Sequence, residues 1–577
     1  MVPERSRLII LLFVLLSLTF LILFNCSSDE PQEGVFNNAV VVSTQKIASE
    51  VGTEILKRGG NAVDAAVAVS YALAVVHPTA GNIGGGGFFV IRMPDGEVKT
   101  IDYREKAPGK GHRDMYVDTK ADTVIAGLSR VGALAVGVPG TVAGTLMALE
   151  KYGTMTPEEV IRPAIELAEN GFILEIPMGG SRFKRFESSN AIFNKPDGSR
   201  FEVGERFIQK DLAKTLEIIA EKGRDGFYKG EVADKIVKTM ENHNGLITHE
   251  DLENYQAVER EAIRGSYRGF EVVSMAPPSS GGICLNQLLN LLERYNIKEL
   301  GWNTPETVHL VTESERRVYA DRAEYLGDPD FVGIPVEKLL SKEYADLRAK
   351  SIDPTKATKS SEINHGNPDV STFPESEETT HYSVIDKDGM AVAVTTTLNG
   401  GYGSTLVAEG AGFLLNNEMD DFSSKPGTPN MYGLLGSDAN AIQPNKRMLS
   451  SMTPTILVKD GKPFMVIGTP GGSTIITTVL QVIMNVVDHG MTIQDAVAAP
   501  RFHHQWFPDR IDYEREAFSE STINKLNEMG HNLRIRGSIG DAHGIIVEFR
   551  SKFLFFTDKC VFGGADPRSV SSAAVGY

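Results

Sequence analysis

At residues 377–383 the chain reads Glu-Glu-Thr-Thr-His-Tyr-Ser, and its character changes within this short stretch. Before it, residues 360–378 are polar, contain two prolines and show no apolar periodicity, which predicts a loop or linker. After it, a β-branched run leads through Asp388-Gly389 to a second run ending near Thr397, which predicts a hairpin. Thr379 therefore stands where an unpacked segment enters a sheet, and it is a candidate for the first residue of a processed chain.

A threonine in first position has chemistry that an internal threonine lacks. Its hydroxyl is a poor nucleophile alone, but a free α-amine on the same residue can take up the hydroxyl proton and activate the oxygen. Cleavage between Glu378 and Thr379 would create that amine. The alternative interpretation is that Thr379-Thr380 simply begins a strand, because threonine is common in strands.

Length and charge limit the classes of protein that fit. The 577 residues are enough to bury a large core. Length alone suggests roughly four domains, or fewer large ones. The formal net charge of -17 argues against nucleic acid as a partner, because neutralising phosphates requires clustered Lys and Arg.

The first residues are typical of an exported protein. Arg5 and Arg7 precede a mostly apolar run from Leu8 to Phe24, which predicts a secretory signal over residues 1–25. Cys26 and a polar spacer follow, so we expect a periplasmic protein, or one that a lipid on Cys26 anchors to a membrane. The alternatives are an uncleaved anchor and ordinary signal cleavage. The other cysteines, Cys284 and Cys560, are too few for a disulfide framework.

The remaining patterns alternate between strand and helix. Residues 39–150 combine short apolar strands with small-residue helices, and Asn61 is a candidate cap for one of them. Helical patterns dominate residues 156–350, where Pro163 is expected to open a helix that Gly171 ends. From Thr379 onward strands and turns return, with an amphipathic helix expected over residues 474–489.

Three Asp-Gly pairs lie between apolar, β-rich runs, and each predicts a hairpin with a two-residue turn. They are Asp95-Gly96, Asp388-Gly389 and Asp460-Gly461. Each turn would place residues with hydroxyl, amide, guanidinium or glycine groups side by side at the end of the hairpin away from the turn. A bulge would shift each pairing by one or two residues. The expected neighbours are Thr379 with Leu398, flanked by Thr397 and Asn399; Ser450 with Gly471 and Ser451 with Pro470, followed by Gly472; and Arg104 with Gly87.

No metal or cofactor site is expected from the sequence. Residues 84–87 are glycines, but they lack the Gly-Lys-Ser/Thr of a phosphate loop and the spacing of a dinucleotide fingerprint. The stretch Thr-His-Glu-Asp at residues 248–251 contains one histidine only. His503 and His504 are adjacent, so on a strand they would face opposite sides instead of sharing a metal.

Motifs spread over nearly the whole mature chain resemble those of γ-glutamyltranspeptidases. Residues 379–399 resemble the start of that family's small subunit, which forms when the precursor cleaves itself. Several motifs are weak alone, but their joint occurrence in this order is highly specific. The others are Gly-Gly-Asn-Ala-Val-Asp-Ala-Ala at 59–66, Asp-Tyr-Arg-Glu-Lys-Ala-Pro at 102–108, Val-Pro-Gly at 138–140, Ala-Pro-Pro-Ser-Ser-Gly-Gly at 276–282, Leu-Asn-Asn-Glu-Met-Asp-Asp-Phe at 415–422, Leu-Ser-Ser-Met at 449–452, Thr-Pro-Gly-Gly at 469–472 and Asp-Pro-Arg at 566–568.

The resemblance implies an α+β fold of the N-terminal-nucleophile hydrolase type. This fold is a four-layer αββα sandwich in which two fragments of one precursor interweave. The fragments would be a large subunit, residues 26–378, and a small subunit, residues 379–577, forming a heterodimer. The implied activity is transfer of the γ-glutamyl group of glutathione, through an ester on Thr379, to water or to an amino-acid or peptide acceptor. No cofactor is implied.

The resemblance also implies roles for individual residues. Thr397 would orient the nucleophile, and the N–H groups of Gly471 and Gly472 would stabilise the developing oxyanion. A guanidinium suits a carboxylate because it makes paired hydrogen bonds. The residues implied for the substrate α-carboxylate are Arg104, Ser450 and Ser451. Those implied for the α-ammonium are Asp421, Asn399 and Glu418, of which Glu418 replaces the glutamine of some relatives.

Residues 426–447 are rich in turn formers and resemble the lid over the site in many family members. Tyr432 would be the tip of this lid, closing over bound glutamate and excluding water. The alternative is an ordinary surface loop.

Two other functions stay open. A sister enzyme on the same fold, such as a cephalosporin acylase or a poly-γ-glutamate transferase, would share the threonine or serine chemistry. The lid argues against a polymeric substrate, and Arg104 with Asp421 argues for a free glutamyl head group. A lipoprotein that binds γ-glutamyl peptides without turning them over would require the precursor to stay intact.

Overall fold

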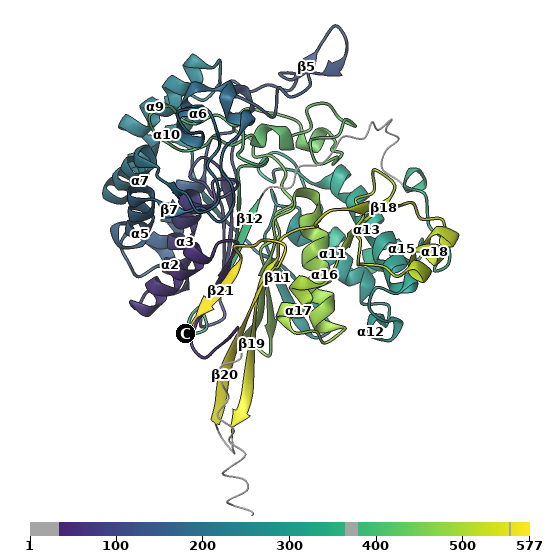
Figure 1. Ribbon diagram of the computed structural model, residues 1–577. Coiled ribbons are helices and arrows are strands. Elements are labelled where there is room, and N and C mark those ends of the chain that lie inside the picture. Colours follow the sequence, from purple (N-terminus) through teal and green to yellow (C-terminus); the bar gives the residue numbers. More distant parts are fainter. Residues whose placement is uncertain (1–33, 364–378, 553–555) are drawn as a thin grey trace, which may run out of the picture. The chain divides into compact units, whose positions relative to one another are not determined.

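Two stacked β-sheets form the centre of the fold in a computed structural model that describes residues 34–363, 379–552 and 556–577 (Figure 1). In the first sheet the strand order is β21-β2-β12-β13-β3-β4-β9, and neighbouring strands are antiparallel. Its strands are β2 (Val40–Ser43), β3 (Gly86–Arg92), β4 (Val98–Asp102), β9 (Val258–Arg260), β12 (Thr380–Ile385), β13 (Ala391–Thr397) and β21 (Ala573–Gly576).

The second sheet places β20-β19-β15-β14-β11-β10 side by side, again with antiparallel neighbours. These strands are β10 (Ile263–Tyr267), β11 (Phe270–Ser274), β14 (Thr455–Lys459), β15 (Lys462–Gly468), β19 (His543–Lys552) and β20 (Phe556–Ala565).

Alternation of side chains along the strands produces the layers. Phe88 and Val90 of β3 pack in one cluster with Ile456 of β14, so this cluster lies between the sheets. Their neighbours Phe89 and Ile91 point the other way and pack with the helices outside the first sheet. The outer face of the second sheet forms a third cluster with its own helices.

Three helices pack directly against the first sheet, namely α2 (Lys46–Lys57), α3 (Ala62–Val76) and α4 (Thr141–Tyr152). The helices α5 (Pro157–Asn170), α7 (Lys210–Lys222) and α9 (Gly230–Asn242) belong to the same layer and pack on other helices. Every residue of α3 is buried, which its small Ala and Val side chains allow. Asn61 caps this helix as predicted, since its side chain accepts hydrogen bonds from the N–H groups of Val63 and Asp64.

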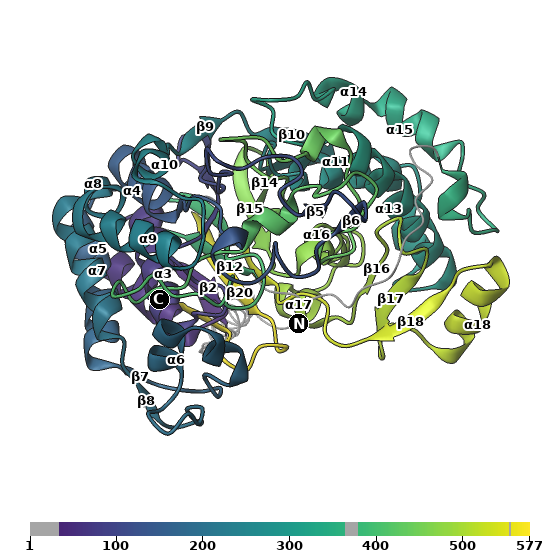
Figure 2. The same ribbon diagram turned by 90° about the horizontal axis from the view of Figure 1, so that it is seen from above.

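The second sheet is covered by another group of helices, on the opposite side in Figures 1 and 2. These are α11 (Gly281–Leu292), α13 (Pro305–Tyr325), α16 (Ile475–Val487), α17 (Ile493–Ala498) and α18 (Glu520–Met529). Helix α16 confirms the amphipathic helix predicted over residues 474–489.

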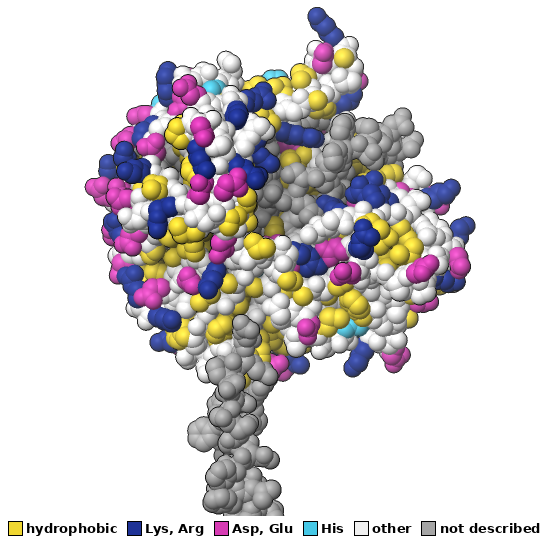
Figure 3. Space-filling model, viewed as in Figure 1, with side chains coloured by type: hydrophobic (Ala, Val, Ile, Leu, Met, Phe, Trp, Pro, Cys, Tyr) yellow, Lys and Arg dark blue, Asp and Glu magenta, His cyan; other side chains and the backbone are white. Residues whose placement is uncertain are grey.

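Shorter elements surround these layers. The helices are α6 (Glu187–Phe193), α8 (Arg224–Tyr228), α10 (His249–Asn254), α12 (Ile297–Leu300), α14 (Val336–Leu340) and α15 (Lys342–Ala349). The strands are β5 (Val117–Asp118), β6 (Thr123–Val124), β7 (Phe172–Ile173), β8 (Arg206–Phe207), β16 (Phe502–His503), β17 (Ile511–Glu514) and β18 (Leu533–Arg536). In the described ranges, no helix is both long enough and apolar enough to cross a membrane. Basic and acidic side chains are intermixed over the face drawn in Figure 3.

Segments from both sides of residue 379 build the first sheet together. Strands β12 and β13, which follow residue 379, lie between β2 and β3, which precede it, and the C-terminal β21 pairs with β2. The predicted α+β, four-layer αββα sandwich with interwoven segments is therefore confirmed. As a result, the start of β12 is held in the middle of the sheet.

The helix predicted to open at Pro163 begins earlier. Thr156 caps it with a capping box to Glu159, and Pro157 occupies the first position, so Pro163 lies inside the helix. Gly171 follows the last helical residue as predicted.

The register of the β12–β13 hairpin differs by one residue from the prediction. Thr380 pairs with Thr396, which places Thr379 level with Thr397 and not with Leu398. A two-residue turn does not form, because the Asp386 carboxylate accepts hydrogen bonds from two N–H groups of the connection, at 3.0 Å each. The correction moves a hydroxyl directly opposite the proposed nucleophile.

The other two hairpins are also adjusted. Tyr103 exchanges main-chain hydrogen bonds with Gly87, so the chain places Arg104 level with Gly86 instead of Gly87. The Asp460-Gly461 turn pairs Lys459 with Lys462 as predicted, but a shift between Leu457 and Val458 changes the register beyond it.

Candidate active site

Thr379 immediately precedes β12 and is 6% exposed. Its hydroxyl oxygen lies 3.4 Å from that of Thr397, the last residue of β13. The Thr397 oxygen also accepts a hydrogen bond of 2.7 Å from the N–H of Asn399, whose left-handed backbone (φ 74°) turns the chain away from the sheet. The hairpin therefore fixes a hydroxyl beside Thr379 and the main chain of Asn399 beside that hydroxyl.

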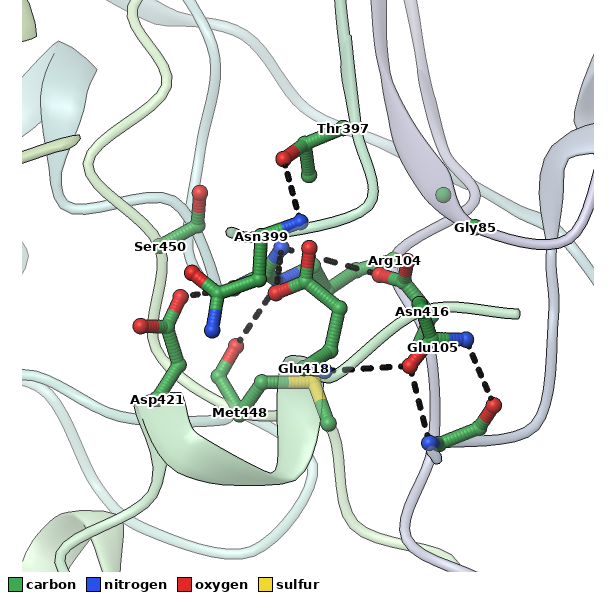
Figure 4. Close-up of polar contacts among 12 residues, drawn as sticks. Gly85, Arg104, Glu105, Thr397, Asn399, Asn416, Glu418, Asp421, Met448 and Ser450 are labelled. Carbon is green, nitrogen blue, oxygen red and sulfur yellow. Dashed lines mark hydrogen bonds and ion pairs between the residues drawn. The ribbon is translucent and has the colours of Figure 1, made fainter. Parts of the chain in front are cut away.

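Arg104 is buried among three carboxylates (Figure 4). Its Nη1 lies 2.6 Å from Glu418 Oε2 and 3.6 Å from Glu105 Oε2, and its Nη2 lies 2.5 Å from Asp421 Oδ2. The guanidinium also donates to two main-chain carbonyls, from Nε to Met448 and from Nη2 to Leu449, at 3.4 Å each. One cation thus organises an acidic cluster in the interior.

Burial raises the carboxyl pKa values in this cluster, because desolvation disfavours the charged form. It raises the pKa of Asp421 to about 6 and that of Glu105 to about 8, and it raises the pKa of Glu418 well above its usual range. The Arg104 charge opposes each of these shifts. Burial and the Arg104 charge thus act in opposite directions on the pKa of each carboxyl group in the cluster.

Ser450, Ser451 and the glycine turn lie on another side of the same cavity. Ser450 Oγ accepts a hydrogen bond from the Met452 N–H at 3.1 Å, which leaves its hydroxyl proton for another acceptor. Gly471 and Gly472 both have positive φ angles, 136° and 54°, just before α16. Within the described part of the chain, neither glycine N–H donates a hydrogen bond. The two amides are thus available to an oxygen ligand.

Tyr432 lies over the cavity and is 4% exposed. Its phenol donates a hydrogen bond of 2.7 Å to the Asn399 carbonyl, and its ring lies where a Cβ on Gly472 would be, 2.4 Å from the nearest ring atom. Asn430 supports the loop by accepting from the Tyr432 N–H at 3.0 Å and donating to Asp421 Oδ1 at 3.1 Å. The segment predicted as a lid is closed.

The closed cavity is small. Its accessible volume is about 30 Å³, room for about one water molecule. Tyr432 forms part of the lining of this narrow space. The site residues predicted from the sequence that line the cavity are Thr379, Thr397, Arg104, Asn399, Glu418, Asp421, Tyr432, Ser450, Ser451 and Gly472. Gly471 adjoins it through Gly472.

Comparison with known proteins agrees with this arrangement. The family model described as gamma-glutamyltranspeptidase matches residues 48–576. The chain belongs to the gamma-glutamyltranspeptidase family. An Escherichia coli (strain K12) protein named "Glutathione hydrolase proenzyme" is 49% identical over 558 residues, covering 95% of this chain and 94% of that protein.

Solved structures are similar to this gamma-glutamyltranspeptidase family member as well. A cephalosporin acylase from Bacillus halodurans aligns with a TM-score of 0.81 at 26% identity, covering 96% of this chain and 98% of that one. A Helicobacter pylori gamma-glutamyltranspeptidase chain aligns with a TM-score of 0.54 at 46% identity, covering 55% of this chain and 93% of that one. The N-terminal-nucleophile hydrolase type of the fold, predicted from the sequence motifs, is confirmed.

Two predicted positions of this gamma-glutamyltranspeptidase family member, Glu378 and the lipid site Cys26, lie outside the described residues. Two charged residues of the site were missed by the sequence analysis. Glu105 adjoins Arg104 in the quoted Asp-Tyr-Arg-Glu motif, so a signal existed. Arg322 comes from α13, where its charge is one of many and gives no signal.

A buried group of His309, Glu313 and His531 brings potential metal ligands within 4.8 Å of one another. Apart from His531 Nδ1, its potential ligand atoms already have protein partners. His309 Nδ1 and His531 Nε2 share a hydrogen bond of 2.8 Å, and Glu313 is paired with Arg317 at 2.7 Å and with Arg316 at 3.4 Å. We therefore assign this group to packing.

Proposed function

We propose that this protein is a self-cleaving γ-glutamyltransferase and glutathione hydrolase whose nucleophile is Thr379. The observation that carries the proposal is the position of Thr379. It lies at the start of a central strand, 3.4 Å from the Thr397 hydroxyl, and lines the same cavity as the buried Arg104. An N-terminal nucleophile and a carboxylate-binding guanidinium thus share one enclosed space.

Maturation would use the same hydroxyl as catalysis. The Thr379 oxygen would attack the carbonyl carbon of Glu378, the C–N bond would break, and the nitrogen would take the hydroxyl proton. Water would then hydrolyse the resulting ester. The products are the subunits 26–378 and 379–577, which stay together as a heterodimer because their strands interleave in the first sheet.

In the mature enzyme the free amine of Thr379 would act as the base. It would accept the hydroxyl proton while the oxygen attacks the γ-carbonyl carbon of glutathione or a related γ-glutamyl compound. The N–H groups of Gly471 and Gly472 would stabilise the oxyanion, a contribution of about 3 to 4 kcal/mol per donor in other enzymes. The departing amine would take the proton, leaving a γ-glutamyl ester on Thr379. Water or the amine of an acceptor amino acid would release it by the reverse proton path.

Substrate binding would rearrange the acidic cluster. The α-carboxylate would take over Arg104 Nη2, which Asp421 now holds, with hydrogen bonds from Ser450 and Ser451. The α-ammonium would bind Asp421, Glu418 and the Asn399 side chain. The exchange keeps each charge paired, which matters in a site where an unpaired ion is costly.

Export would place the enzyme where it meets glutathione outside the cytoplasm. Arg5, Arg7 and the apolar run to Phe24 support a signal over residues 1–25, and Cys26 with its polar spacer supports a lipid anchor and a periplasmic or membrane-attached location. Radiolabelled palmitate should be incorporated into the wild-type protein but not into Cys26→Ala. Labelling of neither protein would contradict the proposed lipid anchor.

An assay with L-γ-glutamyl-p-nitroanilide tests the proposed activity. The purified, processed protein should release p-nitroaniline, and an added dipeptide acceptor should yield a new γ-glutamyl peptide by mass spectrometry. Glutaryl-p-nitroanilide, which lacks the α-ammonium, represents the acylase alternative and should react far more slowly. Faster turnover of the glutaryl compound would favour the acylase, and no turnover of either would favour a binding protein.

A further inference from the structure

Arg322 is a second buried guanidinium in the cavity. It lies near the end of α13, is 4% exposed and lines the same space as Arg104. Its Nε donates to Ser280 Oγ at 2.9 Å and its Nη2 donates to Ser451 Oγ at 3.1 Å. Unlike Arg104, it has no carboxylate within 4 Å among the residues the structure describes.

The direction of these hydrogen bonds is fixed by chemistry. A guanidinium can only donate, so both serine oxygens accept from Arg322. The Ser280 hydroxyl donates a hydrogen bond of 2.6 Å to the Ser450 carbonyl, which links Arg322 to the Ser450 main chain as well. The Ser451 hydroxyl proton has no acceptor in the described part of the chain, so it is left to point to a ligand.

The positive charge of Arg322 is a second reason to expect that it interacts with a substrate carboxylate. Three carboxyl groups already lie within 4 Å of Arg104, so a substrate carboxylate has to compete with them for that one guanidinium. A buried cation without a counter-ion is costly by itself, and an arriving anion offsets that cost. Burial lowers the pKa of Arg322, with a smaller opposing contribution from the nearby Asp421 charge.

We propose that Arg322 is a positioning residue for the substrate α-carboxylate. It would orient the Ser451 hydroxyl toward that carboxylate and supply a second positive charge in addition to that of Arg104. This inference rests on the proposed function, since it presumes a γ-glutamyl substrate. It assigns α13 a part in specificity, through one side chain that reaches the cavity from the helical layer.

A purely structural role would have a different signature. Arg322 also joins α13 to Ser280, which precedes α11, and through Ser280 to the main chain at Ser450, so its loss is expected to loosen the fold locally. Loosening would reduce the reaction of all substrates in proportion. Loss of carboxylate recognition would reduce the reaction of those that carry the α-carboxylate and spare those that lack it.

The test compares Arg322→Gln with wild type on two substrates. L-γ-glutamyl-p-nitroanilide carries the α-carboxylate, and 4-aminobutyryl-p-nitroanilide lacks it but keeps the amine. We expect kcat/KM for the first to fall by about 10- to 100-fold, as for loss of a charged hydrogen bond, and that for the second to change by less than about threefold. Equal losses on both, or no loss on the first, would overturn the proposal.

Two further measurements keep the outcome decisive. Isothermal titration with L-glutamate, the expected product, should show at least about tenfold weaker binding to Arg322→Gln, with partial recovery in Arg322→Lys. Arg317→Gln is the matched control, because Arg317 is equally buried on α13 but pairs with Glu313 away from the cavity. It should leave glutamate affinity unchanged, and unchanged affinity in Arg322→Gln would overturn the proposal.

Cleavage of the precursor into two fragments distinguishes a wrong role for Arg322 from a wrong function for the whole protein. If wild type neither splits into two fragments nor turns over the γ-glutamyl anilide, the proposed function fails. If wild type does both and Arg322→Gln, processed normally, retains full selectivity for the α-carboxylate, the Arg322 inference fails alone. Should Arg322→Gln not fold, Arg322→Lys provides the same comparison with the charge retained and the paired geometry lost.

Discussion

The phenol of Tyr432 donates a hydrogen bond of 2.7 Å to the main-chain carbonyl of Asn399. The N–H of Asn399 donates in turn to Thr397 Oγ, which faces the Thr379 hydroxyl at 3.4 Å. The loop that carries Tyr432 is therefore hydrogen-bonded to the same residue that donates to the Thr397 hydroxyl. The position of Tyr432 and that of the Thr397 hydroxyl are thus linked through one residue, Asn399.

Removing the hydrogen bond between Tyr432 and Asn399 should weaken substrate binding more than it slows the chemical step. Tyr432→Phe loses one hydrogen bond, worth about 0.5 to 1.5 kcal/mol, so KM should rise roughly two- to tenfold with kcat little changed. Tyr432→Ala also loses the ring that covers the cavity and should raise KM further. Steady-state kinetics with L-γ-glutamyl-p-nitroanilide measures both, and unchanged kinetics in Tyr432→Ala would remove the lid assignment.

A methyl group at Gly472 should disturb both lid and oxyanion site. Its Cβ would lie 2.4 Å from the Tyr432 ring, and the residue has φ 54°. We expect Gly472→Ala to lower kcat by about 100-fold or more, since one oxyanion donor is worth that much. Gly461→Ala is the control, because Gly461 has φ 71° with open space around its Cβ position. Equal effects of the two would show that backbone strain, not the site, is responsible.

The Thr397 hydroxyl should matter through orientation. Thr397→Val keeps the shape but removes the oxygen that faces Thr379 and accepts the Asn399 N–H. We expect kcat to fall by about 100-fold with a smaller change in KM, as for a misplaced reacting group. Thr397→Ser should recover most of the rate. Single-turnover release of p-nitroaniline gives the comparison, and a Val variant as fast as wild type would contradict the role.

Glu105 should make stability depend on pH in a specific sense. Its pKa in the folded protein is raised from 4.5 to about 8, chiefly by burial, and its oxygens have no hydrogen-bond partner among the described residues. As pH rises from about 4.5 to about 8, the unfolded chain loses this proton first, so the folded state loses stability over that window. Glu105→Gln removes this loss.

Thermal unfolding between pH 5 and pH 9 checks the sign of the Glu105 effect. The Tm of Glu105→Gln relative to wild type should rise with pH up to about 8 and then level off. The exposed Glu150→Gln should show a constant difference. A Tm difference for Glu105→Gln that falls as pH rises would show that the buried carboxylate is stabilised in its charged form.

Several features of the fold were predictable from local chemistry. The cap and turn residues follow directly from residue type. Asn61 caps a helix, Gly171 ends one, and Asp460-Gly461 forms a hairpin turn. The four-layer arrangement was predicted from the family motifs, because alternation alone does not reveal which strands share a sheet. Pro163 misled the prediction since proline is common in the first turn, and the stronger signal was the Thr156-Pro157 start with Glu159.

The site was predictable to within one residue of register. The Asp386 carboxylate widened the β12–β13 connection and moved Thr397 opposite Thr379, a tertiary detail that two-residue turn rules do not contain. Arg322 was not predictable, because its role depends on where α13 packs. Long-range placement, rather than residue type, brings that side chain to the cavity.

Intact mass with N-terminal sequencing, on purified wild type and Thr379→Ala, tests the central claim most directly. We predict two fragments in the wild type, the smaller one beginning at Thr379, and one uncut chain in Thr379→Ala. A wild type that stays whole under conditions in which it is folded would contradict the N-terminal threonine mechanism, because the base on which that mechanism depends would never form.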